Sequence, residues 1–321
     1  MKLAVVIPCY RAKLHVLDVL AAIPPMVDSI HVVDDACPDD TGRHVEANCN
    51  DPRVRVHYNQ HNLGVGGAVL RGYQEALACG AEIIVKIDGD GQMDPALIAS
   101  FVAPIQSGEA DYTKGNRFFD LTNIGRMPPL RIFGNAVLSF MAKLSTGYWD
   151  IFDPTNGYTA IHAVVARRLP VQKISQRYFF ESDLLFRLNT LRAVVVDIPM
   201  DARYGDEVSN LRISRVTGDF LIKHVRNFMK RIFYNFFLRD LSVASFELVA
   251  GCILMLTGGV YGIVNWIESA RTGHESAAGT VMLAALPLII GLQFLLAFLN
   301  YDIASVPRRP IHVSKGLVDR R

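Results

Sequence analysis

Cysteine is scarce in this chain of 321 residues, and the five that are present make an odd number. None belongs to a Cys-x-x-Cys pair, and none stands at the spacing of a metal site. These absences speak against a disulfide scaffold and against a cysteine-based metal centre. The cysteines therefore predict a reduced protein body that faces the cytosol.

An excess of charge of one sign is also missing, since 33 Lys and Arg residues stand against 31 Asp and Glu residues. The net charge of +2 excludes a nucleic-acid binder that relies on a global basic field, so we expect no nucleic-acid partner. The hydrophobic content of 50% excludes a disordered chain. The length suits one large domain or two modest ones.

Long apolar runs are absent from the first 242 residues, where Met1-Lys2 leads into an apolar run too short for a signal peptide. The long runs lie near the C-terminus, at 243–266 and 280–299. Each is long enough for a helix that crosses a hydrocarbon core of ~30 Å at ~1.5 Å per residue. They predict a transmembrane helical hairpin, with a pair of buried core helices as the alternative.

Basic residues flank this hairpin on both sides, whereas its polar connection contains one arginine, Arg271. Positive flanks favour the cytosolic side, so we expect a two-span membrane protein whose N-terminal body is cytosolic. Gly258 and Gly262 form a GxxxG pattern that would permit homo-oligomer contacts through the membrane helices. The flanking residues are Arg212, Arg215, Lys223, Arg226, Lys230, Arg231, Arg239, Arg308, Arg309, Lys315, Arg320 and Arg321.

Apolar residues also recur at helical spacing just before the first long run, from Leu221 to Phe236. Lys223, Arg226 and Lys230 share a different face of the same helix. This pattern predicts an interfacial amphipathic helix on anionic lipid. An ordinary surface helix packed on the protein body is the alternative.

Over the first 210 residues, short β-branched apolar runs alternate with helical patterns. Asp94 followed by Pro95 is a typical helix start, with a capping side chain and proline at the first helical position. This alternation predicts an α/β fold with a mostly parallel central sheet and helices on both faces. The expected strands are 3–7, 30–33, 54–57, 83–87 and 194–198, and the expected helices are 14–22, 41–47, 68–79 and 96–105.

Distinctive residues follow three of these strands, at the carboxyl ends where ligands bind in parallel sheets. Pro-Cys-Tyr follows the first strand at 8–10, Asp-Asp the second at 34–35, and Asp-Gly-Asp-Gly-Gln the fourth at 88–92. An Asp-x-Asp turn places two oxygen ligands near one point, which suits Mg²⁺ or Mn²⁺ bound together with a diphosphate. This metal hypothesis requires that protein ion pairs leave the carboxylates room for a cation; a solvated acidic loop is the alternative.

The glycine-rich segment 62–67, Asn-Leu-Gly-Val-Gly-Gly, invites comparison with dinucleotide-binding folds. That fit is poor, because Val69 occupies the third glycine position and the segment follows the third strand rather than the first. We interpret the segment either as a tight turn that brings the backbone close to a nucleotide or as a plain helix-entry turn.

In this order and spacing, the motifs resemble those of family 2 glycosyltransferases with a GT-A fold, most closely the polyprenyl-phosphate (dolichol-phosphate) sugar synthases. The resemblance covers nearly the whole chain. It departs at Arg11-Ala12, where the family has Asn-Glu, and at Asn210, where it has lysine. The matching elements are V-I-P-x-Y at 6–10, V-D-D-x-S-x-D-x-T at 33–41, N-x-G-x-G-x-A at 62–68, D-x-D-x-Q at 88–92, G-x-R-F at 115–118, D-x-x-x-G-[FY] at 153–158 and an approximate R-x-x-G-x-S-x-L from 203.

The resemblance implies site roles that are carried over position by position. The nucleoside would be held at the ends of the first two strands, the 88–92 turn would surround a divalent metal and the diphosphate, and arginines would meet the phosphates, because the guanidinium fork pairs well with phosphate oxygens. The alternatives are a surface charge for Arg131, a structural ion pair for Arg203 and a turn residue for Gln92. The implied residues are Pro8, Tyr10, Val33 and Asp35 for the nucleoside, Asp88, Asp90 and Gln92 for the metal, Gly89 beside the diphosphate, Arg117 and Arg131 for the acceptor phosphate and Arg203 for the donor diphosphate, with Asp90, Arg117 and Arg131 as the catalytic set.

The implied reaction is inverting transfer of a sugar from a nucleoside diphosphate to a polyprenyl phosphate. Because a phosphate monoester has a second pKa of ~6, this acceptor needs no strong general base. Glu181 and Asp183, on an expected helix, are the only base candidates. The expected organisation is a catalytic domain over 1–215, a juxtamembrane helix over 216–241, two transmembrane helices over 242–300 and a basic cytosolic tail over 301–321.

Three other functions are compatible with parts of this pattern. A processive polysaccharide synthase would carry a Q-x-x-R-W element, which neither Trp149 nor Trp266 belongs to. A transferase to a lipid hydroxyl and a non-catalytic membrane scaffold that retained the fold are the other two, and a scaffold has no need of a metal site. The sugar, the base of the nucleotide and the polyprenyl chain stay open.

Overall fold

The computed structural model describes residues 1–119, 129–201 and 213–313, without the side chains of 129–132 and 213–217. It divides into two compact units. The first consists of Met1–Met229 and the segment that starts at Pro307, and the second is Lys230–Val306. The predicted organisation divides the chain into four parts by their expected functions, and that division stays a prediction.

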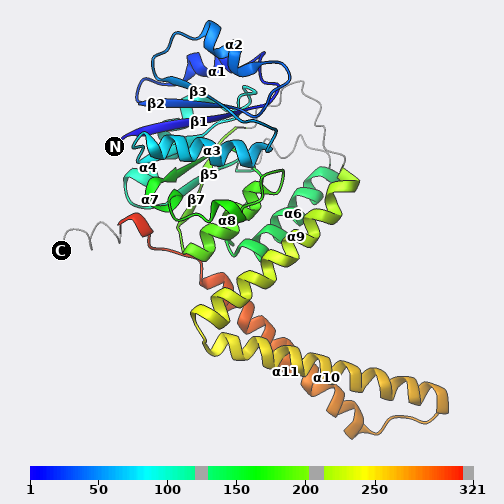
Figure 1. The fold of residues 1–321 in the computed structure, drawn as a ribbon. Helices are drawn as coiled ribbons and strands as arrows, with labels where there is room; N and C mark the ends of the chain where they lie inside the picture. Colours follow the sequence, from blue (N-terminus) through cyan, green and yellow to red (C-terminus); the bar gives the residue numbers. More distant parts are fainter. Residues whose placement is uncertain (120–128, 202–212, 314–321) are drawn as a thin grey trace. The chain divides into compact units, whose positions relative to one another are not determined.

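A seven-stranded sheet forms the centre of the first unit (Figure 1). Its strands lie in the order β3-β2-β1-β4-β6-β5-β7. Only β6 runs antiparallel to its neighbours, β4 and β5, so the prediction of a mostly parallel sheet is confirmed. The strands are β1 (Leu3–Cys9), β2 (Ser29–Asp34), β3 (Val54–Tyr58), β4 (Ile83–Lys86), β5 (Tyr112–Asn116), β6 (Thr159–His162) and β7 (Val195–Pro199).

Helices cover both faces of this sheet because the strands are apolar on both sides. Val5 and Ile7 of β1 belong to the core cluster that includes residues of α1 and α4, whereas Val6 touches Gly72 of α3 on the other face. Alternate side chains of a strand point to opposite faces, which explains the uninterrupted apolar run of β1. The helices are α1 (Val16–Ala22), α2 (Thr41–Asn48), α3 (Val65–Ala78), α4 (Ile98–Gln106), α6 (Pro129–Thr146), α7 (Ala163–Ala166), α8 (Phe180–Leu191) and α9 (Ile213–Phe233).

The helix start predicted at Asp94 is confirmed. Its side chain accepts a hydrogen bond from the backbone N–H of Ala96 at 3.0 Å, and Pro95 opens a 3-10 turn, η1 (Pro95–Leu97), that leads into α4. Two strands, β5 and β6, were not expected from the sequence. β5 reads Tyr-Thr-Lys-Gly-Asn and contains a buried lysine, so it lacks the apolar run by which the other strands were found.

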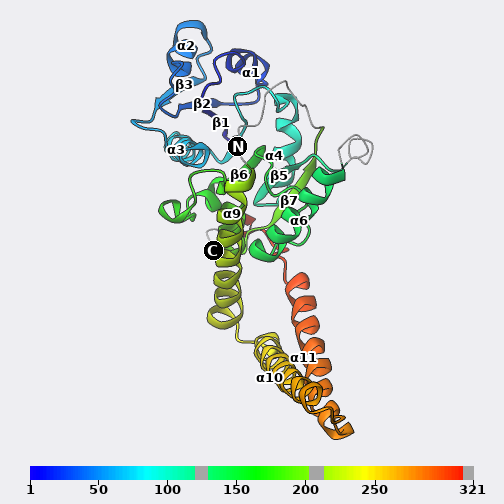
Figure 2. The ribbon, with the colours of Figure 1, turned by 90° about the vertical axis from the view of Figure 1, so that its right-hand side faces the viewer.

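The second unit holds α10 (Val243–Thr272) and α11 (Ala278–Ala304), which run side by side as a hairpin (Figures 1 and 2). Within the described residues, these two helices are long and apolar enough to cross a membrane. Only 22% and 11% of their most apolar stretches are buried, which disfavours the alternative of core helices. The prediction of two apolar C-terminal helices is therefore confirmed.

Glycines let α10 and α11 approach each other closely. A Cβ atom on Gly258 would lie 2.9 Å from the carbonyl oxygen of Ala284, and one on Gly251 would lie 3.0 Å from that of Gly291. A Cβ atom on Gly262 would lie 3.3 Å from the Cβ of Ala284. The GxxxG pattern thus serves contact within the hairpin, and it no longer argues for contact between copies of the chain.

The segment after α11 returns to the first unit and binds Asp111, a fully buried residue just before β5. Its carboxylate accepts hydrogen bonds from the backbone N–H groups of Ile311 and His312 at 2.9 and 3.1 Å. The His312 ring lies 2.7 Å from the same carboxylate and stacks on His162 with centroids 4.2 Å apart. The tail is thereby fastened to the sheet near β5 and β6.

Candidate functional site

The acidic turn follows β4 at the carboxyl edge of the parallel strands. Asp88, Asp90 and Gln92 are all partly exposed on it. The backbone N–H of Gln92 donates to Oδ1 of Asp90 at 3.0 Å, and Gly91 adopts a φ of +77° that favours glycine. Gly89 lies against β1, where a Cβ would come within 3.1 Å of the Cys9 sulfur. The turn therefore lies close to the end of β1.

A buried lysine engages one of the two carboxylates. Lys86 ends β4 with a side chain that is 2% exposed, and its Nζ lies 2.6 Å from Oδ1 of Asp88. This ion pair was not expected from the sequence. The sequence feature that could have pointed to it is a single charged residue within the apolar run Ile-Ile-Val-Lys-Ile at 83–87.

The turn can hold a divalent cation, provided that other ligands complete the coordination. Within the described residues, no group of three or more His, Cys, Asp or Glu side chains could hold a metal alone. Mg²⁺ is usually bound through one or two carboxylates together with substrate phosphates and water. Asp90, the second oxygen of Asp88 and the amide oxygen of Gln92 are hard ligands that suit this mode of binding.

The acidic pair after β2 organises the neighbouring loops. The buried carboxylate of Asp34 accepts backbone N–H groups of Cys37 and Gly42, each at 2.7 Å. The carboxylate of Asp35 accepts the N–H groups of Leu63 and Gly64 at 2.9 and 2.7 Å. Asp35 also accepts from the side-chain amide of Asn59 at 2.8 Å. Contact of Asp35 with a nucleoside stays a prediction, and the structure adds that this residue anchors the glycine-rich segment.

The glycine-rich segment is a helix-entry turn. Gly64 has a φ of +86° just before α3, and the N–H groups of Gly66 and Gly67 both donate to the carbonyl oxygen of Gln176. A Cβ atom on Gly66 would lie 2.5 Å from the ring of Phe180. The glycines thus make room for other parts of the protein, and the alternative of a close approach to a nucleotide has no support from these contacts.

The residues predicted to hold the nucleoside lie together at the ends of β1 and β2, where Pro8 pairs in register with Val33. Val33 is 0% exposed and Pro8 is buried. Their side chains therefore support the ends of the strands and offer a ligand little surface, and their contact with a nucleoside stays a prediction. Tyr10 is 48% exposed, with the Arg11 guanidinium 5.6 Å from its ring centre.

A polar hollow opens beside the ends of β2 and β3. Its volume is about 320 Å³. Three carboxylates and an arginine line it, so it offers acceptors and donors to a polar ligand. The lining residues are Asp34, Ala36, Cys37, Asp40, Arg43, Glu46, Tyr58 and Asn59.

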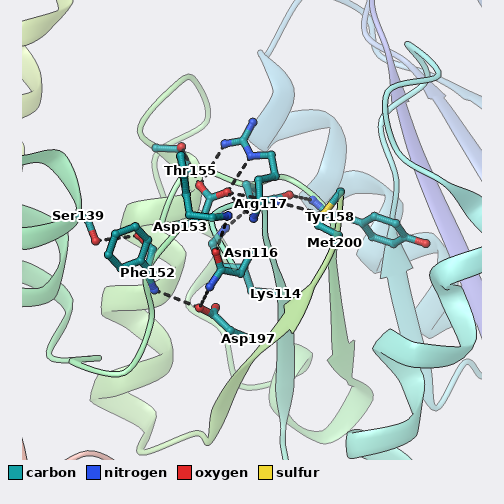
Figure 3. Close-up of polar contacts among 12 residues, drawn as sticks. Lys114, Asn116, Arg117, Ser139, Phe152, Asp153, Thr155, Tyr158, Asp197 and Met200 are labelled. Atoms are coloured by element: carbon teal, nitrogen blue, oxygen red, sulfur yellow. Dashed lines mark hydrogen bonds and ion pairs between the residues drawn. The ribbon is translucent and has the colours of Figure 1, made fainter. Parts of the chain in front are cut away.

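Arg117 follows β5 and is held by Asp153, as Figure 3 shows. Its Nε and Nη2 donate to the two carboxylate oxygens at 2.7 and 3.0 Å. Asp153 is 1% exposed and Arg117 is 34% exposed, so a buried anion fixes a cation that reaches the surface. Arg131 lies on α6 but its side chain, like the whole of Arg203, is outside the described residues.

Further buried titratable groups lie beneath the site. Burial lowers the pKa of Lys114 to about 8, and its ammonium donates to the carbonyl oxygen of Asn156. Burial raises the pKa of Glu181, although the positive charges of Lys86 and Lys114 act in the opposite direction. Burial also raises the pKa of Asp197 to about 6. Asp197 accepts from the Asn116 amide and from the backbone N–H of Phe152 (Figure 3).

Asp183, one of the two base candidates, serves the structure of α8 and its neighbours. Its buried carboxylate accepts the backbone N–H of Ser175 at 2.8 Å and the side-chain amide of Asn227 at 2.9 Å. Both of its oxygens are therefore engaged. Of the two base candidates, Glu181 is therefore the one that remains near the acidic turn.

Residues 4–169 match the family described as Glycosyl transferase family 2. The chain is 28% identical over 215 residues to a UDP-N-acetylglucosamine–dolichyl-phosphate N-acetylglucosaminyltransferase of Methanococcus voltae, covering 63% of this chain and 85% of that protein. It is 29% identical over 171 residues to an undecaprenyl-phosphate mannosyltransferase of Micrococcus luteus, with 53% and 69% covered. It is 26% identical over 201 residues to a polyprenol monophosphomannose synthase of Mycolicibacterium smegmatis, with 61% and 75% covered.

Solved structures share the fold at lower sequence identity. Glucosyl-3-phosphoglycerate synthase from Mycobacterium tuberculosis, in complex with Mn²⁺, UDP and phosphoglyceric acid, superposes with a TM-score of 0.54. The identity is 19%, and the alignment covers 72% of this chain and 78% of that one. The same enzyme was also solved with Mg²⁺ and UDP, again with a TM-score of 0.54 and 20% identity.

Proposed function

The chain belongs to glycosyl transferase family 2 and has the GT-A fold, and from this premise we propose that it transfers a sugar from a nucleoside-diphosphate sugar to a polyprenyl phosphate at a membrane. The donor would be of the GDP-mannose or UDP-glucose type and the acceptor a dolichyl or undecaprenyl phosphate. The observation that carries the proposal is the acidic turn at the carboxyl end of β4. The relatives named above support the choice of acceptor, since their names specify dolichyl, undecaprenyl or polyprenol substrates.

Asp90, Asp88 and Gln92 would hold Mg²⁺ or Mn²⁺ on the turn. When bound, the cation would neutralise the charge that builds up on the leaving diphosphate. Gly89 would let the diphosphate approach the backbone, and Tyr10 would offer the nucleoside an exposed ring next to the end of β1. Arg203 would pair with the donor diphosphate through its guanidinium fork.

Arg117 and Arg131 would bind the acceptor phosphate. A phosphate monoester is mostly ionised at neutral pH, because its second pKa is ~6. The reaction therefore needs no strong base, in agreement with an Asp183 that is occupied by hydrogen bonds. The role of these residues is to place the phosphate oxygen in line with the anomeric carbon.

The membrane part of the proposal rests on several apolar surfaces. Besides α10 and α11, the first unit carries exposed apolar side chains at one-turn intervals on α6 (Phe133, Val137, Phe140) and on α9 (Ile222, Val225, Met229). Ser145 of α6 and His224 of α9 are joined by a hydrogen bond of 2.7 Å. Helices of this kind lie in the interface layer, which the phosphate head of a polyprenol reaches. The basic flanks favour a cytosolic catalytic domain.

Transfer assays with the full chain in lipid test this proposal. We expect labelled sugar to pass to polyprenyl phosphate from one member of a panel of nucleotide sugars, with Mg²⁺ or Mn²⁺ present, and Asp90→Ala to abolish transfer without unfolding the protein. Asp18→Ala, an exposed carboxylate on α1, is the matched control and should retain transfer. Sugar transfer to diacylglycerol instead of the phosphate, or full activity of Asp90→Ala, would contradict the proposal.

A further inference from the structure

Lys86 is a charged residue at a position where the fold otherwise places apolar side chains. It closes β4, whose four residues are all buried. A buried ammonium is costly unless an anion compensates it. The compensating anion is Asp88, the first carboxylate of the acidic turn, at 2.6 Å.

The pair is enclosed on one side by the backbone of Gly157. A Cβ atom there would overlap Nζ of Lys86 and would lie 2.9 Å from Oδ2 of Asp88. The pair is therefore packed against protein. This contact gives a physical reason for the glycine in the D-x-x-x-G-[FY] element, because any larger residue would press on both charged groups.

A carboxylate that is shared with an ammonium is a weaker ligand for a second cation. Two positive charges near one carboxylate repel each other, and at a partly buried site this repulsion is poorly screened by water. A nucleoside diphosphate changes the balance, since its oxygens bring negative charge and further ligands for the metal. Cation binding at this turn would then depend on the nucleotide.

We propose that Lys86 is a positioning residue that acts as an internal counter-cation: it competes with the divalent metal for Asp88, so that the metal binds well only together with the donor's diphosphate. This inference rests on the proposed function. The proposed role of Lys86 goes beyond that of a structural ion pair, which would only stabilise the fold. The metal would not stay bound to the empty enzyme, and donor and metal would arrive as one charge-compensated unit.

Titration of the full chain with Mn²⁺, followed by electron paramagnetic resonance of the free ion, tests the proposal without an activity assay. The wild type should bind Mn²⁺ weakly alone and about tenfold or more tightly when UDP or GDP is present. Lys86→Met keeps the length of the side chain and removes its charge. This variant should bind Mn²⁺ alone about tenfold more tightly than the wild type does, and the nucleotide should add much less.

Lys114→Met is the matched control, because Lys114 is an equally buried lysine on β5 that donates to a carbonyl oxygen and not to Asp88. It should retain the weak binding of Mn²⁺ alone. Lys86→Gln is a second neutral variant with the same expected gain, for use if thermal unfolding shows that Lys86→Met does not fold.

The outcomes separate this inference from the proposed function. If the wild type binds no Mn²⁺ even with UDP or GDP, the metal-dependent function and the inference both fail. If the wild type shows the coupling but the neutral Lys86 variants bind Mn²⁺ alone no more tightly, only the inference is overturned. An equal gain in Lys114→Met would also overturn it, since loss of any buried lysine would then suffice.

Discussion

Asp153 fixes the direction of the Arg117 guanidinium by two hydrogen bonds, and this geometry leads to a prediction about the acceptor. In Asp153→Asn, one oxygen becomes an amide nitrogen that cannot accept from Arg117. Loss of one bond to a charged group costs about 1.5–3 kcal/mol. We expect the KM for polyprenyl phosphate to rise about tenfold, with a smaller change in kcat, in initial-rate assays.

Thr155→Ala is the control for that experiment, because the Thr155 hydroxyl lies 3.5 Å from Asp153 and contributes little. Its KM should stay near that of the wild type. If Asp153→Asn lowers the melting temperature while the KM is unchanged, Asp153 has only a structural role.

Gly157 leads to a prediction about stability. In Gly157→Ala the added methyl group would overlap the Lys86 ammonium, and overpacking of this kind costs about 1–3 kcal/mol. Gly134→Ala on α6 is the matched control, since no atom of the described residues lies within 4 Å of its Cβ position. Denaturant unfolding should show a loss for the first and no loss for the second; equal stabilities would contradict the packing described here.

The parts of the site whose residues belong to short motifs could be predicted from the sequence. The Asp-x-Asp spacing marked the turn at 88–92, and that turn does lie at the carboxyl edge of the sheet. The motif could not show that Lys86 takes one oxygen of Asp88, or that Asp35 binds the 63–64 backbone, because these contacts depend on how separate loops fold together. The motif that contains Val33 likewise could not show that its side chain is fully buried in the sheet.

At the scale of elements, apolar runs determined which parts of the fold could be predicted. β1 to β4 and β7 were found within two residues at their ends, because each is a short apolar or β-branched run between turns. β5 and β6 were missed. β5 is polar in sequence but buried, with Lys114 paired to a carbonyl group, and β6 reads Thr-Ala-Ile-His, which contains only two consecutive apolar residues. In strands of this kind, tertiary contacts rather than the local sequence determine that the segment is extended.

The α10 and α11 hairpin supports a prediction with a control one residue away. Gly258→Leu would press on the carbonyl oxygen of Ala284, 2.9 Å from its Cβ position, whereas the nearest atom to a Cβ on Gly259 is 3.9 Å away on Leu288. We expect Gly258→Leu to lower the SDS concentration at which the full chain unfolds in bicelles, and Gly259→Leu to leave it nearly unchanged. The reverse order would contradict the packing of the hairpin.

At the scale of the whole molecule, buried histidines predict loss of stability in mild acid. Burial lowers the pKa of His31, His162 and His224 to about 4. The unfolded chain takes up these protons near pH 6.5 and the folded protein only near pH 4, so the free energy of unfolding should fall as the pH drops between these values. Asp197, with a pKa raised to about 6, opposes part of this fall.

His224 isolates the effect, because it is 2% exposed and its Nε2 has no hydrogen-bond partner among the described residues. Its contribution is on the order of 3 kcal/mol for a shift of this size. Urea unfolding at several pH values between 7.5 and 4.5 should show a shallower decline for His224→Phe than for the wild type. Parallel profiles would contradict the assignment.

The hydrogen bonds between Asp111 and the segment after α11 have a consequence for when the fold can be completed during synthesis of the chain. The carboxylate near β5 receives its N–H partners from residues 200 and 201 positions later, and the whole apolar hairpin lies between them. A ribosome must therefore synthesise the whole hairpin before these hydrogen bonds at the start of β5 can form. The rest of the first unit can begin to fold early, but these bonds form only after the hairpin has been synthesised, so their presence marks a molecule whose hairpin has already been made.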